Sequence, residues 1–593
     1  MFSSSGTTIL RTSILAAATL VGAKALHIGV PRQAPSISWS ACPDSDTTQC
    51  AFFDVPREYE NATDSDTVSI FMRRYPANAS QESRLGSILV NPGGPGGSGN
   101  LFIAAGGGEK LSAALDGRYD IIGFDPRGVN LTGPWTACFA TEAEPVSLEY
   151  QEILQGAPYP HSTDSSDQMV LRKLRAIQAS HNAACVERGN RKILESVGTA
   201  FVAQDMARIV EALGEDGLNF LGYSYGTILG ATFAAMRPDL VKRMLLDGVS
   251  NAESYYNDVW KWGKDGMDDT QKTLDGFLST CAEAGPEYCA FAAPPKNSNK
   301  TQTTESLRRR LNAIYTRLDR QPMSIGSSLA GPGVFTASNL QRLLLGILYS
   351  PRIWSVIMQG LASLEQGNAT DAYTSLFLPY QDANTEPYDQ NVFNRSMQRS
   401  GGTRESLRAI LCSDAAATNI SVKAHADYYR EIGKISSVGE QWANLISACN
   451  GWSFRASQRY TGPWTVAKGL KKTRFPILFI SLDADPVTPL SSAVKMAKGF
   501  GNESATLLIQ QGYGHPSNAH PSLCTIRHMR DYFLDGKVPT NGTHCTPEPG
   551  FIYPTNTTNS KRAMLDKRDK MLLEAVEGLS EARSKLNLAT WGF

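Results

Sequence analysis

A serine between two glycines, at the junction of an expected strand and an expected helix, constrains this chain more than any other segment. Residues 222–226 read Gly-Tyr-Ser-Tyr-Gly, with Ser224 at the centre. The apolar run 218–221 precedes them, and a segment of small residues follows at 227–236. A strand that turns sharply into a helix strains the backbone at the serine, and the two glycines leave room for that turn. The segment therefore indicates a buried strand with Ser224 exposed at the edge of a sheet.

Further apolar runs bounded by glycine or proline recur along the chain, and we predict that they are buried strands. The interval 201–213 has apolar residues at helical spacing instead. Strands that alternate with helices over short links are typical of a mainly parallel sheet with helices on both faces. We therefore expect an α/β fold. The predicted strands are 68–72, 87–90, 119–124, 218–221, 241–246, 475–480 and 505–509.

The 593 residues are more than one such sheet needs. Helical periodicity dominates a long interval before the last strands, which is too much chain for one crossover and indicates a cap. The charged C-terminal tail contains a segment, 571–586, that favours either an amphipathic helix or a flexible, processed end. We divide the chain into a signal peptide (1–25), the first part of the core (36–250), a mainly helical cap insertion (251–469), the second part of the core (470–552) and the tail (553–593).

The N-terminus predicts secretion. Arg11 precedes the short apolar run 14–21, and Ala23 and Ala25 resemble a signal-peptide cleavage site. The ten cysteines include no C-x-x-C pair, which argues against a zinc or redox motif. Sequential pairing into five disulfides fits an oxidising compartment, but the spacing leaves the connectivity open. N-x-[ST] acceptors, which predict glycans on the surface of a eukaryotic protein, begin at Asn61, Asn78, Asn130, Asn299, Asn368, Asn394, Asn419, Asn502, Asn541 and Asn556.

The charge balance excludes two classes of partner. The chain has 57 basic and 57 acidic residues, so no strong field favours nucleic acid or an anionic membrane. We expect no nucleic-acid partner and no stable membrane association. The sequence sets no oligomeric state.

A serine hydroxyl needs a base to become a nucleophile, and the base needs an acid to orient it. In a fold of this kind the chain order is serine, acid, histidine. His515 follows the last predicted strand in a glycine-rich loop, and His520 is the alternative. Asp485 follows the strand before it, at the sheet edge where ligands bind. Asp483 and Asp247 compete with it for the role of the acid.

Acyl transfer also needs N–H donors for the oxyanion that develops. Residues 91–99 follow an early strand and are rich in glycine. We expect the backbone N–H of Gly94, together with that of Gly93, to act with the N–H of Tyr225. This loop lacks the G-K-[ST] ending of a phosphate-binding loop, and its spacing differs from G-x-G-x-x-G.

The segments 50–56, 91–99, 125–128, 222–227 and 485–489 together resemble the secreted tripeptidyl-aminopeptidase-like branch of the α/β hydrolases, which is related to the proline iminopeptidases. The resemblance spans about residues 40 to 550, and we expect a fungal member. It implies a helical cap before the last strands and release of short peptides from N-termini. It places a triad on Ser224, Asp485 and His515. The chain has Asn91 where relatives have histidine, which weakens the link to the proline iminopeptidases proper.

An aminopeptidase needs a negative pocket for the α-ammonium group of its substrate. Asp414 in the insertion is our candidate, against the alternative of a structural aspartate beside a disulfide. The sequence requires neither a metal nor an organic cofactor. A secreted carboxylesterase or other hydrolase of small esters and amides would use the same triad with a different cap. A catalytically inactive binding protein of this fold is the third alternative, and the intact serine, acid and histidine motifs count against it.

Overall fold

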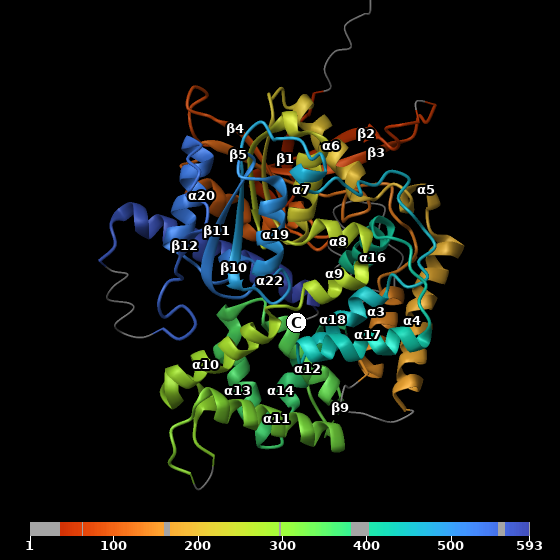
Figure 1. Ribbon diagram of the computed structural model, residues 1–593, viewed down its shortest axis with the longest axis vertical. Helices are drawn as coiled ribbons and strands as arrows, with labels where there is room; N and C mark the ends of the chain where they lie inside the picture. Colours follow the sequence, from red (N-terminus) through yellow and green to blue (C-terminus); the bar gives the residue numbers. More distant parts are fainter. Residues whose placement is uncertain are drawn as a thin grey trace, which may run out of the picture. The chain divides into compact units, whose positions relative to one another are not determined.

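The computed structural model describes residues 36–61, 63–158, 166–295, 298–380, 402–554 and 564–591. Ten strands of this part of the chain form one sheet in the order β1-β2-β3-β5-β4-β6-β7-β10-β11-β12 (Figure 1). From β5 to β12 neighbouring strands run parallel, and β1, β2 and β3 extend the sheet in antiparallel fashion. This confirms the predicted α/β fold. The strands are β1 (Ser40–Cys42), β2 (Ser45–Pro56), β3 (Thr67–Tyr75), β4 (Gly86–Asn91), β5 (Tyr119–Phe124), β6 (Leu218–Tyr223), β7 (Val241–Asp247), β10 (Ile477–Ala484), β11 (Ala505–Tyr513) and β12 (Thr543–Cys545).

Helices cover both faces of this sheet, because successive strand residues point to opposite sides. Phe220 of β6 packs in one apolar cluster with α6 (Thr199–Ala212), α7 (Tyr225–Met236) and α19 (Leu490–Phe500). Its neighbour Leu221 packs in a second cluster with α2 (Gly108–Ala114), α20 (Leu523–Asp535) and α22 (Lys567–Trp591). The catalytic candidates follow the carboxyl ends of parallel strands between these two layers. The remaining helices of this region are α1 (Gly99–Phe102), η1 (Ile103–Gly107), α3 (Ala143–Gln155), α4 (Ser166–Arg188), α5 (Arg191–Leu194), η2 (Pro238–Leu240) and η7 (Ser517–Ala519).

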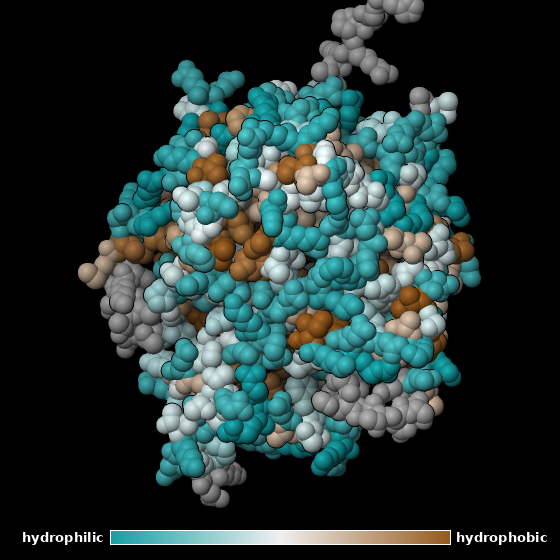
Figure 2. All heavy atoms as spheres, viewed as in Figure 1, coloured by the Kyte–Doolittle hydropathy of each residue, from teal (hydrophilic) through white to brown (hydrophobic). Residues whose placement is uncertain are grey.

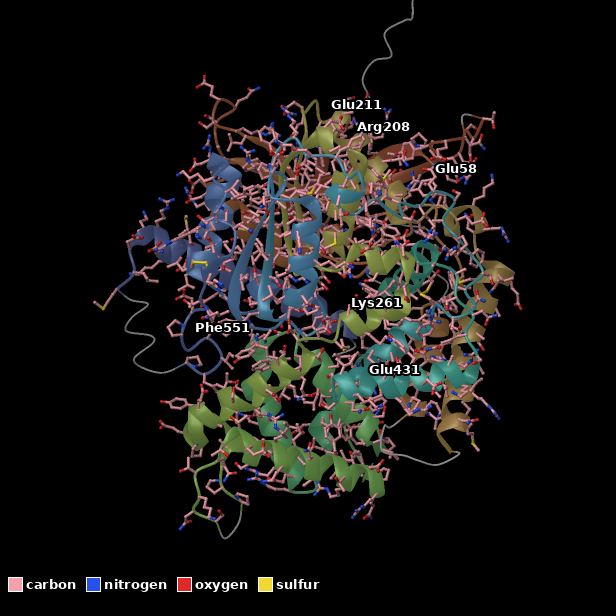
Figure 3. The ribbon with its side chains drawn as sticks, viewed as in Figure 1. Glu58, Arg208, Glu211, Lys261, Glu431 and Phe551 are labelled. Atoms are coloured by element: carbon pink, nitrogen blue, oxygen red, sulfur yellow. A yellow bond between two sulfur atoms is a disulfide. The ribbon has the colours of Figure 1, made fainter. Side chains whose placement is uncertain are left out.

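The chain between β7 and β10 is mainly helical, with one short two-stranded sheet. Ion pairs link neighbouring helices there: Lys264 of α9 lies 3.0 Å from Glu431 of α17, a residue that Figure 3 labels. Its elements are α8 (Ala252–Asn257), α9 (Val259–Asp265), α10 (Thr270–Tyr288), η3 (Ala290–Ala292), α11 (Thr304–Arg320), β8 (Met323–Ile325), β9 (Gly333–Phe335), α12 (Ala337–Ile347), η4 (Pro351–Ile353), α13 (Trp354–Glu365), α14 (Thr370–Phe377), η5 (Leu378–Tyr380), α16 (Gly402–Asp414), α17 (Val422–Ile435), α18 (Gly439–Ser447) and η6 (Val466–Lys468).

Helices α3 and α4 pack with this insertion, although they precede the serine in the chain. Figure 1 shows both beside α17 and α18, away from the sheet. The Gln178 side chain of α4 donates to the Asn444 carbonyl oxygen at 3.1 Å, and Arg342 of α12 donates to Glu149 of α3 at 3.1 Å. Two helices from the interval 36–250 therefore pack against helices from the interval 251–469.

Five disulfides join the ten cysteines in sequential order, the connectivity that the sequence left open. The pairs are Cys42–Cys50, Cys138–Cys185, Cys281–Cys289, Cys412–Cys449 and Cys524–Cys545. The paired residues are 8 to 47 positions apart in the chain, and Cys138–Cys185 joins the loop after β5 to helix α4.

The C-terminal tail is helical where the structure describes it. Helix α22 packs its apolar residues against α2 and α20 and contributes to the second apolar cluster. Of the two alternatives for 571–586, the structure has the helix. The predicted signal peptide lies outside the described residues.

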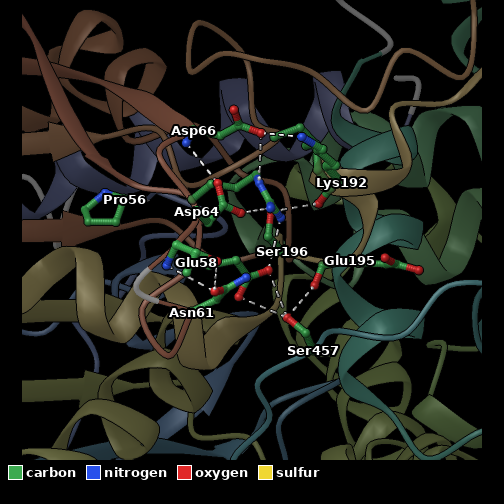
Figure 4. A network of polar contacts seen from close by, with 12 residues as sticks. Pro56, Glu58, Asn61, Asp64, Asp66, Lys192, Glu195, Ser196 and Ser457 are labelled. Carbon is green, nitrogen blue, oxygen red and sulfur yellow. Dashed lines mark hydrogen bonds and ion pairs between the residues drawn. The ribbon is translucent and has the colours of Figure 1, made fainter. Parts of the chain in front are cut away.

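Polar residues cover most of the face shown in Figure 2, and apolar residues form separate patches on it. On the loop after β2, Figure 4 shows a polar network in which the Ser457 hydroxyl donates to Glu58 at 3.2 Å and Lys192 contacts Asp66 at 2.6 Å. No helix in the described ranges combines the length and the apolar character that crossing a bilayer requires.

Candidate active site

Ser224 occupies a strained turn between β6 and α7. Its φ of 57° and ψ of −124° lie outside the regions that a serine usually adopts. The two flanking glycines are required by contact, since a Cβ on Gly222 would lie 2.4 Å from the Gly226 carbonyl oxygen. The backbone N–H of Ser224 donates to the Asp247 carbonyl oxygen at 3.0 Å, which ties the turn to the end of β7. Strain of this kind at a serine is typical of an activated nucleophile.

The structure brings Asp485 and His515 together. The His515 Nδ1 atom lies 2.8 Å from Asp485 Oδ2, and both side chains are buried. The other carboxylate oxygen of Asp485 accepts the backbone N–H groups of Val487 at 3.0 Å and Thr488 at 2.8 Å. These bonds fix the carboxylate as an acceptor, so the imidazole carries its proton on Nδ1. Its Nε2 atom is left as a base and has no hydrogen-bond partner among the described residues.

The neighbours of the imidazole place it beside the serine turn. A Cβ on Gly248 would lie 3.2 Å from His515 Cε1, and Gly248 directly follows Asp247, whose carbonyl holds Ser224. The Thr488 hydroxyl lies 3.0 Å from Nδ1, and the ring of Tyr349 contacts the imidazole edge-on. Tyr349 also accepts the backbone N–H of His515 at 3.0 Å, so the insertion helps to hold the histidine loop.

The glycine-rich loop after β4 reaches the nucleophile. A Cβ on Gly93 would lie 2.7 Å from Ser224 Cβ and 3.3 Å from its Oγ. The Gly93 N–H is occupied, since it donates to Asn91 Oδ1 at 3.0 Å. The N–H groups of Gly94 and Tyr225 have no partner among the described residues, and the latter begins helix α7. Of the three expected oxyanion donors, these two are available, while Gly93 provides the close approach.

The competing residues have other partners. The Asp247 carboxylate accepts the N–H of Ser517 at 3.0 Å and its hydroxyl at 2.7 Å, and burial raises the Asp247 pKa to about 7. Asp483 accepts the Gly512 N–H at 3.0 Å. The Nδ1 atom of His520 accepts the Tyr513 N–H at 3.3 Å, and burial lowers the His520 pKa to about 4. Each of these residues supports a loop.

Asp414 does not face a space for substrate. It is fully buried, and its carboxylate accepts the Thr199 N–H at 2.9 Å, the Thr199 hydroxyl at 2.5 Å and the Tyr255 hydroxyl at 3.0 Å. Thr199 also lies 2.5 Å from the Tyr225 hydroxyl. With its oxygens used in this way, Asp414 anchors the start of α6, and this geometry favours the structural alternative over an ammonium site.

A different carboxylate in the insertion has one oxygen without a hydrogen-bond partner. Glu440 of α18 is fully buried, its Oε1 has no hydrogen-bond partner among the described residues, and burial raises its pKa to about 8. Its Oε2 accepts the Gln341 side-chain N–H at 3.3 Å, while Gln341 Oε1 is also unpartnered. No local sequence signal singles out Glu440, because its burial depends on the packing of α12 against α18.

The expected glycosylation acceptors differ in exposure. Asn130 is partly buried, and its Nδ2 donates to Asp125 at 2.9 Å and to Ser98 at 3.2 Å, which makes it the least suited to carry a glycan. Asn394 and Asn556 lie outside the described residues. The exposed acceptors are Asn61, Asn78, Asn299, Asn368, Asn419, Asn502 and Asn541.

One cluster in the described part of the chain has donor atoms close enough for a metal, namely Cys524, His528 and Cys545. The two sulfur atoms are bonded to each other as a disulfide. The cluster therefore offers no thiolate, and a single imidazole does not make a metal site.

Known proteins are similar in sequence to this chain over most of its length. Residues 435–545 match the family model described as TAP-like protein. The chain is 32% identical to the tripeptidyl aminopeptidase of Streptomyces lividans, covering 89% of each chain. It is 25% identical to serine protease Hip1 and 26% identical to carboxylesterase B, both of Mycobacterium tuberculosis, over 89% and 88% of this chain and 94% and 92% of theirs. The chain is a serine hydrolase that belongs to the TAP-like family of the α/β hydrolases.

Proposed function

We propose that the protein is a secreted aminopeptidase that releases short peptides, tripeptides above all, from free N-termini. Ser224 Oγ attacks the scissile carbonyl carbon as His515 Nε2 takes its proton, and Asp485 stabilises the imidazolium that forms. The Gly94 and Tyr225 N–H groups bind the oxyanion. The imidazolium then protonates the leaving amine, and water hydrolyses the acyl-enzyme by the same route. The observation that carries this proposal is the buried Asp485–His515 pair, whose Nε2 is left free as a base.

The preference for a free N-terminus rests on Glu440. An ammonium group offers three N–H donors, and the unpartnered oxygens of Glu440 and Gln341 would accept two of them. Trp442, two residues beyond Glu440, has an unpartnered indole nitrogen. A Cβ on Gly266 would lie 3.4 Å from that nitrogen and 3.1 Å from the Val487 carbonyl oxygen, so Trp442 lies near the loop that carries Asp485. The tripeptidyl aminopeptidase relative supports a peptide substrate.

Secretion and glycosylation complete the proposal. The signal-peptide pattern, the five disulfides and the exposed N-x-[ST] acceptors all support an oxidising, extracellular location. A carboxylesterase is the second candidate, favoured by the similarity to carboxylesterase B. A binding protein without activity is disfavoured by the Asp485–His515 pair.

A substrate panel tests this function. Tripeptidyl, dipeptidyl and prolyl anilides, each with a free and an acetylated N-terminus, are compared with short p-nitrophenyl esters. We expect turnover of the free-amine tripeptides, loss of that turnover in Ser224→Ala, and little turnover of the acetylated forms. Turnover of esters alone would select the carboxylesterase, and no turnover at all would revive the binding protein.

Glu440→Gln tests the ammonium site separately. Its raised pKa means that Glu440 has to release its proton to bind an ammonium group as a carboxylate. The charged hydrogen bond then contributes about 1.5–3 kcal/mol, so KM for the free-amine tripeptide should rise about 10- to 100-fold while ester turnover is unchanged. Glu431→Gln is the matched control, because this exposed carboxylate pairs with Lys264 on the surface of the same insertion. An equal effect of both variants would discard Glu440 as the ammonium site.

A further inference from the structure

The C-terminal helix α22 carries a buried cation on its apolar face. Leu572, Val576 and Leu579 of this face pack in the second apolar cluster. Arg583, four residues after Leu579, lies on the same face and is 4% exposed. Its Nη1 donates to the Pro92 carbonyl oxygen at 2.6 Å. The guanidinium also stands over the ring of Tyr223, 5.0 Å from the centroid. A residue near the end of the chain thus reaches both the glycine-rich loop and the serine turn.

Packing alone does not account for an arginine at this position. Burial of a cation costs free energy, and a leucine or methionine would fill the same face without that cost. Arg583 has no direct salt bridge among the described residues, and its Nε has no hydrogen-bond partner there. Asp247 and Asp485 act on it only at longer range, where their charges oppose the lowering of its pKa by burial. The close polar contact of the guanidinium is therefore the carbonyl of Pro92.

That carbonyl belongs to the peptide unit that precedes the oxyanion donor. The N–H of the same unit is that of Gly93, which donates to Asn91 Oδ1. Arg583 and Asn91 thus hold the two polar ends of one peptide group, while Gly93 packs against Ser224. The next peptide unit carries the Gly94 N–H, and its Gly93 carbonyl oxygen accepts the Gly97 N–H at 3.0 Å. The two units share the Gly93 Cα, so holding the first unit helps to direct the N–H group of the second. The side chain of Asn91 supplies one half of this clamp.

We infer that Arg583 is a positioning residue for the oxyanion hole, and that helix α22 supports the active site by placing Arg583 against the Pro92 carbonyl. The inference rests on the proposed function, because it assumes acyl transfer at Ser224. Helix α22 makes polar contacts with the insertion as well: Ser584 Oγ lies 3.2 Å from Ser350 Oγ, and Arg352 donates to the Glu577 carbonyl oxygen at 2.8 Å. Helix α22 also contacts η7, directly after the His515 loop.

The test compares Arg583→Met, Arg583→Lys and Arg352→Met in the full chain. Removal of an oxyanion donor costs about 10²- to 10³-fold in kcat, so its misorientation in Arg583→Met should cost at least about 10-fold. KM should change less than about threefold, since substrate binding does not use the oxyanion hole fully. Arg583→Lys keeps the charge and one donor and should recover most of kcat. Arg352→Met removes a guanidinium–carbonyl bond to the same helix and should lower Tm but leave kcat unchanged.

A transition-state mimic separates positioning from loosening of the fold. The Ki of a tripeptidyl aldehyde, whose adduct places its oxygen in the same hole, should rise in Arg583→Met by the factor that kcat falls. If kcat is unchanged, or falls in both Met variants in proportion to Tm, the inference is overturned. Arg583→Gln replaces Arg583→Met if the latter does not fold. Unchanged activity in Ser224→Ala would instead overturn the proposed function, so the two failures are distinct.

Discussion

Replacement of Asp485 by asparagine should abolish activity through the tautomer of His515. The oxygen of the new amide should stay where Asp485 Oδ1 accepts two backbone N–H groups, those of Val487 and Thr488. The amide NH₂ would then face His515 Nδ1, which has to become an acceptor. The imidazole proton moves to Nε2, and that atom can no longer take the proton of Ser224.

The expected loss is about 10⁴-fold in kcat, which corresponds to about 5 kcal/mol of barrier. The assay is steady-state hydrolysis of the best anilide or ester, with Tm measured in parallel to show that the fold is intact. Asp483→Asn is the matched control, because its carboxylate accepts only a loop N–H and lies 3.5 Å from Lys272 at the surface. Its kcat should stay within about threefold of wild type. More than a tenth of the wild-type kcat in Asp485→Asn would refute the assignment of the acid.

Three further changes probe the same site. His515→Ala should lower kcat at least about 10⁴-fold, whereas His520→Ala should lower Tm and leave kcat within about threefold, as steady-state assays and thermal melts of both variants would show. Gly93→Ala should lower kcat about 100-fold, because its φ is 105° and the added Cβ would meet Ser224 at 2.7 Å; a normal kcat would contradict the close approach. Burial raises the Glu440 pKa from 4.5 to about 8, so the folded state binds this proton more tightly than the unfolded chain. Protonation of Glu440 therefore adds to the free energy of unfolding. This contribution is fully present below pH 4.5 and is lost as the pH rises to about 8. In thermal melts from pH 5 to 8.5, the Tm of Glu440→Gln should therefore rise relative to that of wild type as the pH increases. A difference in Tm that stays constant over this range would contradict the raised pKa.

The strand and loop positions of the triad candidates could be predicted because their signals are local. Ser224 sits in a glycine-bracketed turn, and Asp485 and His515 each follow an apolar run that the structure confirms as a strand. In a parallel sheet, the carboxyl ends of the strands meet at one edge, so the loops converge without further information. The disulfide connectivity was less accessible, since the spacing of ten cysteines does not fix which of them pair.

Residues whose role depends on distant packing could not be found in this way. Asp414 resembles an ammonium ligand in sequence, but Thr199 and Tyr255, both far away in the chain, use its oxygens. No local sequence pattern distinguishes Glu440, because its burial depends on the packing of helix α12 against α18. Arg583 has a local signal, because it is a cation at an apolar position of an amphipathic helix. Its partner could not be predicted, since Pro92 is 491 residues away in the chain.

The most direct test of the account is to locate the nucleophile by covalent labelling. The protein is treated with a fluorophosphonate, and the adduct is mapped by mass spectrometry of its peptides. We expect one adduct, on Ser224, that is absent in Ser224→Ala and forms far more slowly in His515→Ala. An adduct on another residue, or none on folded protein, would contradict the proposed active site.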